Sequence, residues 1–422
     1  MAERQFHDRH FPVRPNLEQL KHQAKDLLRA IRKADPFAIA ELRKHHTKPI
    51  EPAAKLADAQ LALARSYGLP SWPRLVTACR MTEAIWRGEA ETVRKLVLKD
   101  PRLLHEAARG LPDSNWGPPM SYAANVGQDA IIQMLRDLGA TDVQHAFDRA
   151  CLQGRIETAR RLYAMGARPL AGCMMGPCET LNASGLALLF ELGAEFADEH
   201  GDRLAPVALL LQTYSRGARP KHECLELLVK RGIALPDTPT MAVHRGRIDL
   251  LEAHLARDHQ LLTRTFSHEE IYPPELGCHA DHSLALHGTP LAGTTLLHLC
   301  VDFDEIEIAR WLLHNDRGMD VNAKAQVDSD GFGGHTPLFG CIVSQPYRCG
   351  LQKDADFTRL LLEHGADPNA RASLRKRLRF VDDESMYEYR DVTPLSWGER
   401  FHNKDWVNPA AMRLIEERSK HG

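Results

Sequence analysis

GHTPL at residues 334–338, followed by LLLEHGADPNA at residues 360–370, is the stretch of sequence that decides the fold. Threonine before proline is typical of a helix start, because the hydroxyl can accept a hydrogen bond from an unpaired backbone N–H and proline fits the first helical position. The leucines predict a second helix that returns antiparallel to the first. Gly365 then favours a left-handed helix end, and the polar residues after it begin a turn.

The same phrase recurs along the chain. GTTLLH at residues 293–298 leads to GMDVNA at 318–323, and DVTPL starts another copy at 391–395. Weaker copies end in glycine, at Gly139, Gly166, Gly193 and Gly232. Two more copies echo each other and end in Asp-x-x-Leu-Leu, namely RGEAETVRKLVLKDPRLL at 87–104 and RGRIDLLEAHLARDHQLL at 245–262. Together they predict about nine repeats between residues 80 and 422.

A turn plus two antiparallel helices, about 33 residues in all, is the pattern of the ankyrin repeat. The chain resembles the ankyrin-repeat family, sharply at residues 293–370, partially at 391–415 and weakly at 80–262. The resemblance implies an all-α fold, a solenoid of stacked helix-turn-helix units with an N-terminal helical cap. It also implies a protein-protein interaction scaffold or adaptor, which holds another protein through its concave, finger-tipped face and is not an enzyme and needs no cofactor.

The repeat pattern also predicts which residues form the core. Ala123-Ala124, Ala150-Cys151, Cys300 and Cys341 fall where small side chains let neighbouring first helices approach closely. We therefore expect these cysteines to behave as small buried hydrophobes rather than as reactive thiols. Leu338 and Leu361 are expected in the core between repeats.

Composition limits the remaining function classes. The formal net charge of the 422 residues is −2, so no global field favours nucleic acid, a membrane or a highly acidic partner. The N-terminus is too charged for a signal peptide, and the longest apolar run, Leu204–Leu211, is too short to span a bilayer. The nine cysteines lack framework spacing and indicate reduced thiols. We therefore expect a cytoplasmic protein without a membrane partner.

Residues 13–79 differ from the repeats and follow a tail at residues 1–12. An apolar stripe predicts one helix from residue 17, with Asn16 as its N-cap and Gln19 three residues later, and two more near 36–45 and 55–66. The phrase YGLPSWP at 67–73 resembles the helical leader of many bacterial ankyrin-repeat proteins. We interpret the segment as a cap that covers the first repeat, with a partner-binding head as the alternative.

Two insertions interrupt the array. The first, residues 263–292, divides the degenerate repeats at 80–262 from the repeats at 293–422. It contains four weak metal-ligand candidates, His268, Cys278, His279 and His282, and His279 and His282 would share a helix face. Their spacing matches no zinc module, so a solvated loop is favoured. A metal-dependent or enzymatic site in this insertion stays open as an alternative function.

The second insertion, residues 371–391, is expected to form an extended finger with a basic run at 371–379. We favour either a solvated face or pairing of these cations with the acids at 382–384 and Glu388 on the same finger, and an acidic protein partner comes next. Nucleic-acid binding through the run is the least favoured alternative.

No nucleophile motif such as G-x-S-x-G is present, so no catalytic residue is predicted. Seven residues at fingers or at starts of first helices are candidate partner contacts, because aromatic residues and arginine are enriched in interface hot spots: Trp116, Phe332, Arg375, Arg377, Tyr387, Tyr389 and Trp397. For Trp116 and Trp397, packing between repeats is an equal alternative.

Overall fold

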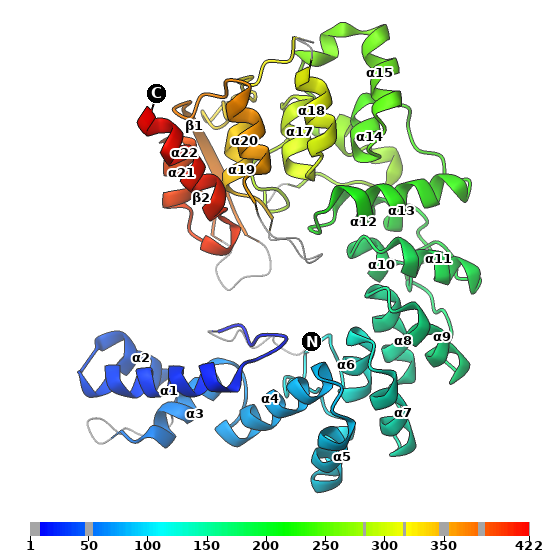
Figure 1. Ribbon diagram of the computed structural model, residues 1–422, viewed down its shortest axis with the longest axis vertical. Coiled ribbons are helices and arrows are strands. Elements are labelled where there is room, and N and C mark those ends of the chain that lie inside the picture. The colour runs from blue at the N-terminus through cyan, green and yellow to red at the C-terminus, as the bar shows by residue number, and fades with distance from the viewer. Residues whose placement is uncertain are drawn as a thin grey trace. The chain divides into compact units, whose positions relative to one another are not determined.

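The computed structural model describes residues 9–46, 54–281, 284–314, 318–345, 354–378 and 385–421. The chain forms two compact units, Met1–Pro169 and Leu170–Gly422, and each is described by itself. Both are mainly helical (Figure 1). Short amphipathic helices recur in both units. The described core therefore consists of the apolar faces of these helices, which pack against one another.

The first unit begins with three helices, in the segment that we interpret from the sequence as a cap. Asn16 is the N-cap of the first helix, and its side chain accepts a hydrogen bond from Gln19 N at 3.0 Å, as predicted. Leu20, Leu63 and Leu75 share one buried apolar cluster, which continues from the cap into the first repeat helix. This continuity supports the capping interpretation. The cap helices are α1 (Leu17–Arg32), α2 (Pro36–His45) and α3 (Leu56–Ser66).

Three helix pairs follow in the first unit. The first helices α4, α6 and α8 pack side by side, and the second helices α5 and α7 pack beside each other. Ala123, Ala150 and Cys151 are buried where α6 meets α8, which confirms the prediction that small residues let these helices approach. The pairs are α4 (Trp72–Trp86) with α5 (Ala90–Lys99), α6 (Pro119–Val126) with α7 (Asp129–Asp137), and α8 (Val143–Leu152) with α9 (Ile156–Ala164).

The second unit continues the pairing of short helices. Its first helices α10 and α12, and then α14, α17, α19 and α21, contact one another in sequence order (Figure 1). Leu338, Leu361, Cys300 and Cys341 are buried, as predicted. The pairs are α10 (Met175–Glu179) with α11 (Ala183–Glu191), α12 (Ala205–Gln212) with α13 (Ala218–Lys230), α14 (Pro239–His244) with α15 (Ile248–Arg257), α17 (Leu296–Phe303) with α18 (Ile306–Leu313), α19 (Pro337–Ile342) with α20 (Asp356–Glu363), and α21 (Pro394–Arg400) with α22 (Pro409–His421).

The helix ends follow the sequence signals closely. Gly365 has φ +85° after α20, and Ala366 N donates to Leu361 O at 2.9 Å, which completes the left-handed helix end. Thr336 is the N-cap of α19, but its hydroxyl makes no capping bond, so this detail of the prediction is wrong. At the start of α21 the corresponding hydroxyl, of Thr393, does accept from a backbone N–H, at 3.3 Å.

The two Asp-x-x-Leu-Leu copies share one local structure. Asp100 and Asp258 each accept a hydrogen bond from the backbone N–H two residues ahead and begin a short 3₁₀ helix. These helices, η1 (Pro101–Leu104) and η2 (His259–Leu262), bury both leucines at their ends. The sequence echo therefore reflects one conformation used twice.

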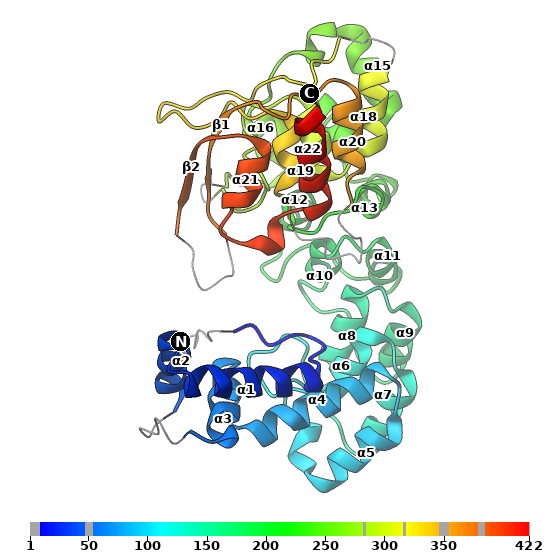
Figure 2. The same ribbon diagram turned by 60° about the vertical axis from the view of Figure 1, so that its left-hand side comes forward.

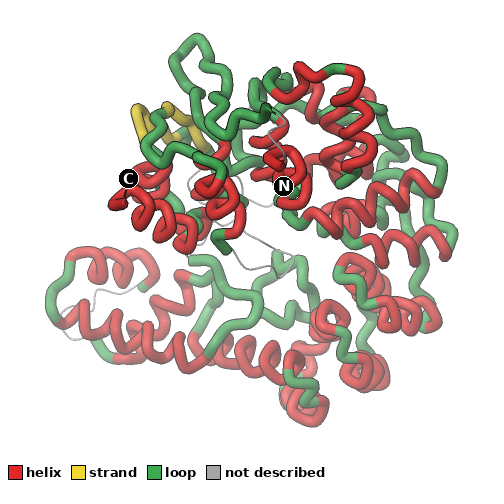
Figure 3. Tube along the Cα trace, turned by 45° about the horizontal axis from the view of Figure 1, so that its top comes forward, coloured by secondary structure: helices red, strands yellow, loops and turns green. Residues whose placement is uncertain are grey.

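The expected finger at residues 371–391 contains the strands β1 (Ala372–Lys376) and β2 (Tyr387–Val392), which pair antiparallel (Figure 2). They are the yellow segments of Figure 3, and this short ribbon was not expected, although the described chain is mainly helical as predicted. On the other edge of β1, Ser373 pairs with Gly333, which also pairs with Val327. The backbone groups of these residues are paired across the finger instead of within a helix.

The insertion at residues 263–292 is packed rather than solvated over much of its length. Phe266 pairs with Thr294 in a backbone bridge, and α16 (His268–Ile271) and η3 (Pro274–Leu276) follow. Tyr272 and Cys278 are buried. The solvated-loop interpretation is therefore wrong for these residues, because their apolar surface is covered by neighbouring first helices, among them α12 and α14.

Candidate functional site

The finger surface, which we define as the turn at residues 326–334 together with β1, Met386 and β2, is cross-linked by a central arginine. Arg375 bonds Asp330 at 3.0 Å and also pairs with Asp328. The guanidinium carbons of Arg375 and Arg390 lie 4.5 and 4.2 Å from the ring centre of Phe332. The two arginines over the Phe332 ring and the two carboxylates that pair with Arg375 hold the turn against the β1–β2 ribbon.

Two arginines of the basic run, Arg371 and Arg375, pair internally, but not with the acids expected from the sequence. Arg375 reaches the preceding turn, and Arg371 pairs with Asp391 across the ribbon. Glu388 pairs with its neighbour Arg390 at 3.2 Å. The acids at 382–384 lie outside the described residues. Since these arginines already have carboxylate partners, they offer little unpaired charge to phosphates.

Lys376, the residue after the central arginine, points into the core instead of into solvent. Its ammonium group donates to Leu284 O at 2.7 Å and to His287 O, and it lies 4.7 Å from the ring centre of Trp406. Burial lowers the pKa of Lys376 to about 7. This side chain fastens the ribbon to the insertion at residues 263–292.

A buried polar network lies beneath the ribbon. The Asp302 carboxylate accepts from Arg216 Nη2 at 3.2 Å, from His287 Nδ1 at 2.7 Å and from Gly288 N at 3.3 Å. Because a carboxylate only accepts, His287 Nδ1 carries the proton, and Nε2 accepts from the Tyr272 hydroxyl at 3.2 Å. Burial alone would raise the pKa of Asp302, but attraction to His287 and Arg216 outweighs it and lowers the pKa.

A second buried cation lies close by. Lys221 donates to His244 Nδ1 at 2.6 Å, and its ammonium lies 4.1 Å from the ring centre of Phe303. Burial lowers the pKa of Lys221 to about 7 and keeps His244 uncharged by lowering its pKa as well. His244 Nε2 in turn lies 2.8 Å from Ile271 O, so this pair also fastens the insertion.

The Tyr272–His287–Asp302 chain has the order of a proton relay, but its surroundings do not favour catalysis. All three side chains are buried. The neighbouring cavity, lined in part by Arg216, Lys221 and Phe303, has a volume of about 10 Å³. A cavity of that size holds a water molecule and no substrate. The network therefore acts as a structural lock between the insertion and α17.

Three of the four metal-ligand candidates lie in the described part of the chain, and they form no metal-binding group there. Burial raises the pKa of the Cys278 thiol to about 12, which disfavours the thiolate that a metal needs. His268 Nε2 lies 3.0 Å from His279 O, a backbone acceptor, and the chain at His279 is not helical. His282 lies outside the described residues. Within the described part of the chain, no group of three or more His, Cys, Asp or Glu could hold a metal ion.

The predicted contact residues divide into two groups. Phe332, Tyr389 and Trp397 are buried, and Trp397 packs edge-on against Tyr389 with ring centres 4.7 Å apart. A side chain so enclosed offers a partner no surface, so packing is the better interpretation of these three. By contrast, Tyr387 is partly exposed on the ribbon, where it stacks on His402 at 3.8 Å.

The other predicted contacts keep some exposed surface. Arg375 and Arg377 are partly exposed on or next to the ribbon. Trp116, also partly exposed, belongs to the first unit, where its ring centre lies 5.0 Å from that of Tyr122. The structure therefore brings Arg375, Arg377 and Tyr387 together in one finger and places Trp116 elsewhere.

Two exposed apolar side chains of the finger surface were not predicted. Val327 is 61% exposed and Met386 is 39% exposed, in the turn and just before β2. Nothing in the local sequence distinguishes them from core residues, because exposure depends on how the turn folds over the ribbon. Exposed apolar residues beside aromatic residues and arginine are typical of a contact surface.

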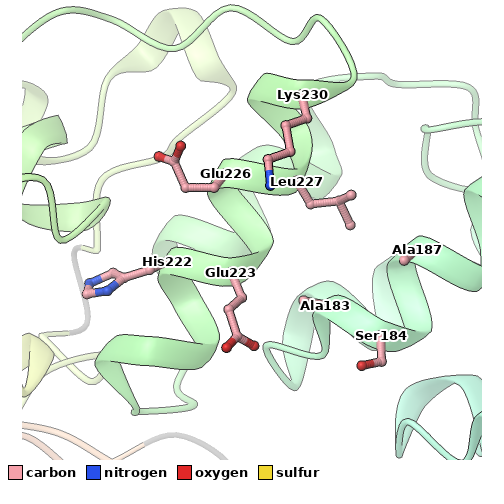
Figure 4. Close-up of a pocket in the computed structure, with 8 residues that line it drawn as sticks. All are labelled: Ala183, Ser184, Ala187, His222, Glu223, Glu226, Leu227 and Lys230. Atoms are coloured by element: carbon pink, nitrogen blue, oxygen red, sulfur yellow. The ribbon is translucent and has the colours of Figure 1, made fainter.

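The second unit also carries an open groove of about 460 Å³ between α11 and α13. Figure 4 shows the small residues Ala183, Ser184 and Ala187 on α11, and the charged or polar lining residues on α13. Three of those polar side chains already have partners within the protein. Glu223 bonds Arg219, Glu226 bonds Arg245, and His222 lies 2.7 Å from Glu305. The groove is therefore a weaker candidate than the finger surface.

Comparisons with known proteins agree with the fold of one segment. The family model of the ankyrin repeat matches residues 292–326, which contain α17, α18 and the start of the turn that reaches the finger surface. A search of curated proteins finds no match. In the described part of the chain, no helix combines the length and the apolar character needed to cross a membrane. The chain thus contains an ankyrin repeat, a module that generally serves protein interaction.

Proposed function

We propose that this protein is a protein-protein interaction scaffold, an ankyrin-type solenoid that binds another protein through its finger surface. The family match at residues 292–326 and the repeated helix pairs on both sides of it support the solenoid. The observation that carries the binding surface is the contact of Arg375 with the turn, beside which Val327 and Met386 stay exposed. A preordered finger binds with little loss of conformational entropy.

The alternative functions have less support. The described cavity beside the buried network has a volume of about 10 Å³, which is too small for a substrate at the buried side chains of the insertion. Nucleic-acid binding through residues 371–379 is disfavoured because Arg371 and Arg375 have carboxylate partners and Lys376 is buried. Protein binding is the only one of the three that uses side chains the finger leaves exposed.

Affinity capture from an extract of the source cells tests this proposal. The bait is the full chain as wild type, as Val327→Asp and as Leu98→Asp. Leu98 lies on α5 and is 60% exposed, so it matches Val327 in exposure but lies outside the finger surface. We expect a protein that wild type and Leu98→Asp retain and that Val327→Asp loses. Retention by all three baits, or by none, would contradict the proposal.

A further inference from the structure

The residues before the first helix form an extended strap that lies on the first unit. The strap, residues 9–15, is the dark blue loop that leads into α1 in Figure 2. Phe11 is 1% exposed, and its ring packs edge-on against Tyr67 with centres 5.6 Å apart. Arg9 N donates to Ser66 O at 3.0 Å. The segment that the sequence suggested as a tail is thus packed from residue 9 onwards.

Two side chains of the repeats bind the backbone of the strap. The Arg109 guanidinium donates to Phe11 O, and the Tyr122 hydroxyl donates to Val13 O at 2.7 Å. Tyr122 is itself held by Trp86, whose indole N–H donates to the hydroxyl at 2.7 Å. The two carbonyls are two residues apart on the strap. A surface that donates hydrogen bonds to main-chain carbonyls spaced in this way can bind an extended segment independently of its side chains.

A third contact recognises a side chain of the strap, that of Arg14. Arg14 makes two hydrogen bonds to the Glu83 carboxylate, at 2.9 and 3.1 Å, and its guanidinium carbon lies 5.3 Å from the ring centre of Trp86. A fork of two bonds plus an aromatic face selects arginine over lysine. Phe11 and Arg14 are three positions apart. The surface therefore accepts an aromatic residue followed three residues later by arginine.

The strap does not fill the surface on which it lies. A groove of about 540 Å³ borders Arg14 and Pro15 and continues over Arg80 of α4 towards the start of α5. The Arg14 side chain is half exposed at its edge. A longer segment with the same two anchors would keep every contact of the strap and add contacts in this groove.

We propose that this face of the first unit is a binding surface for an extended protein segment of the pattern aromatic–x–x–arginine, and that the strap occupies it in cis as an internal competitor. Three observations carry the proposal: the aromatic pocket for Phe11, the two carbonyl donors and the arginine fork. A tethered segment acts at an effective concentration on the order of millimolar, so a partner must contribute additional contacts to displace it. The surface is separate from the finger surface and does not depend on it.

The test adds a free strap peptide to the full chain. The probe is a fluorescent peptide with the sequence of residues 9–16, RHFPVRPN. The chain carries Phe11→Ala and Arg14→Ala together, which loosens the strap. We expect the peptide to bind this variant at least tenfold more tightly than wild type, because the competitor in cis is weakened. A peptide with alanine at both anchor positions should bind the loosened chain at least tenfold more weakly than the intact peptide.

Two further variants place the binding site. Glu83→Gln in the loosened chain should weaken peptide binding at least fivefold, since it removes the carboxylate that pairs with arginine. Arg102→Ala is the matched control in the otherwise wild-type chain, because this exposed arginine pairs with Asp100 on the same segment and is not part of the strap contacts described above. Its peptide affinity should equal that of wild type.

The outcomes separate a binding surface from a purely structural strap. If thermal melting shows that Phe11→Ala does not fold, Arg14→Ala alone takes its place, since that side chain is half exposed. A folded, loosened chain that does not bind the peptide overturns the proposal. Equal binding to wild type and to the loosened chain, or equal binding of the intact and alanine peptides, overturns it as well.

Discussion

Replacing Asp302 by asparagine should destabilise the second unit strongly. The carboxylate is 95% buried as a side chain and binds Arg216, His287 and the Gly288 amide. Asparagine keeps the size but removes the charge, so the Arg216 guanidinium stays buried without a carboxylate in contact. Breaking a buried ion pair on one side costs about 3–5 kcal/mol, because the remaining charge keeps its desolvation penalty. We expect the free energy of unfolding to fall by about that amount.

Urea unfolding followed by circular dichroism and tryptophan fluorescence measures this loss. Because the chain has two compact units, two transitions are expected, and only the one that belongs to residues 170–422 should shift. Glu307→Gln is the matched control, since this carboxylate is 73% exposed as a side chain and pairs with Arg310 one helical turn away. It should change stability by less than about 0.5 kcal/mol. A loss below about 1 kcal/mol for Asp302→Asn would refute the view that the network is a structural lock.

Two other predictions concern the finger and the buried lysines. Gly333→Ala should abolish hydrogen-exchange protection where the turn pairs with β1, because φ is +126° and an added Cβ would collide with Gln326 O. Gly365→Ala is the control, since this glycine has φ +85° and open space around it, and protection of the turn should stay intact. Unchanged protection in Gly333→Ala would contradict the prediction. Burial lowers the pKa of Lys221 and Lys376 from 10.5 to about 7, so above pH 7 the unfolded chain binds more protons and stability should rise with pH. From pH 7 to 8 the free energy of unfolding should rise by about 1 kcal/mol per lysine, and below pH 7 the dependence should level off. Methionine at either position should remove the contribution of that lysine. A wild-type free energy of unfolding that is flat between pH 7 and 8 would contradict the assignment.

The local pattern was sufficient to predict most of the helices and their ends. Gly365 and Asn16 act on backbone groups within four residues of themselves, so their roles can be read from neighbouring letters. The same holds for the Asp-x-x-Leu-Leu copies at Asp100 and Asp258, which form the same short helix twice. Small residues such as Cys300 were correctly expected in the core, because repeat position alone determines which face a helix buries.

The candidate site was predicted only in part. Arg375 was correctly expected to pair internally, but its partners Asp328 and Asp330 come from another turn. Trp397 and Tyr389 have the composition of a hot spot, yet the packing of α21 against β2 buries them. Burial of an aromatic side chain at a repeat boundary depends on the neighbouring repeat, which the local sequence does not describe.

The sequence by itself thus determined the repeating helix pairs, and the tertiary structure decided what fastens them. Arg216 and Asp302 are 86 positions apart, Lys376 and Leu284 are 92 apart, and Arg109 and Phe11 are 98 apart. Hydrogen bonds that close a helix end span a few residues and leave a local signature. Contacts across such separations leave none, because any buried cation needs an acceptor and only the folded chain determines which one lies within reach.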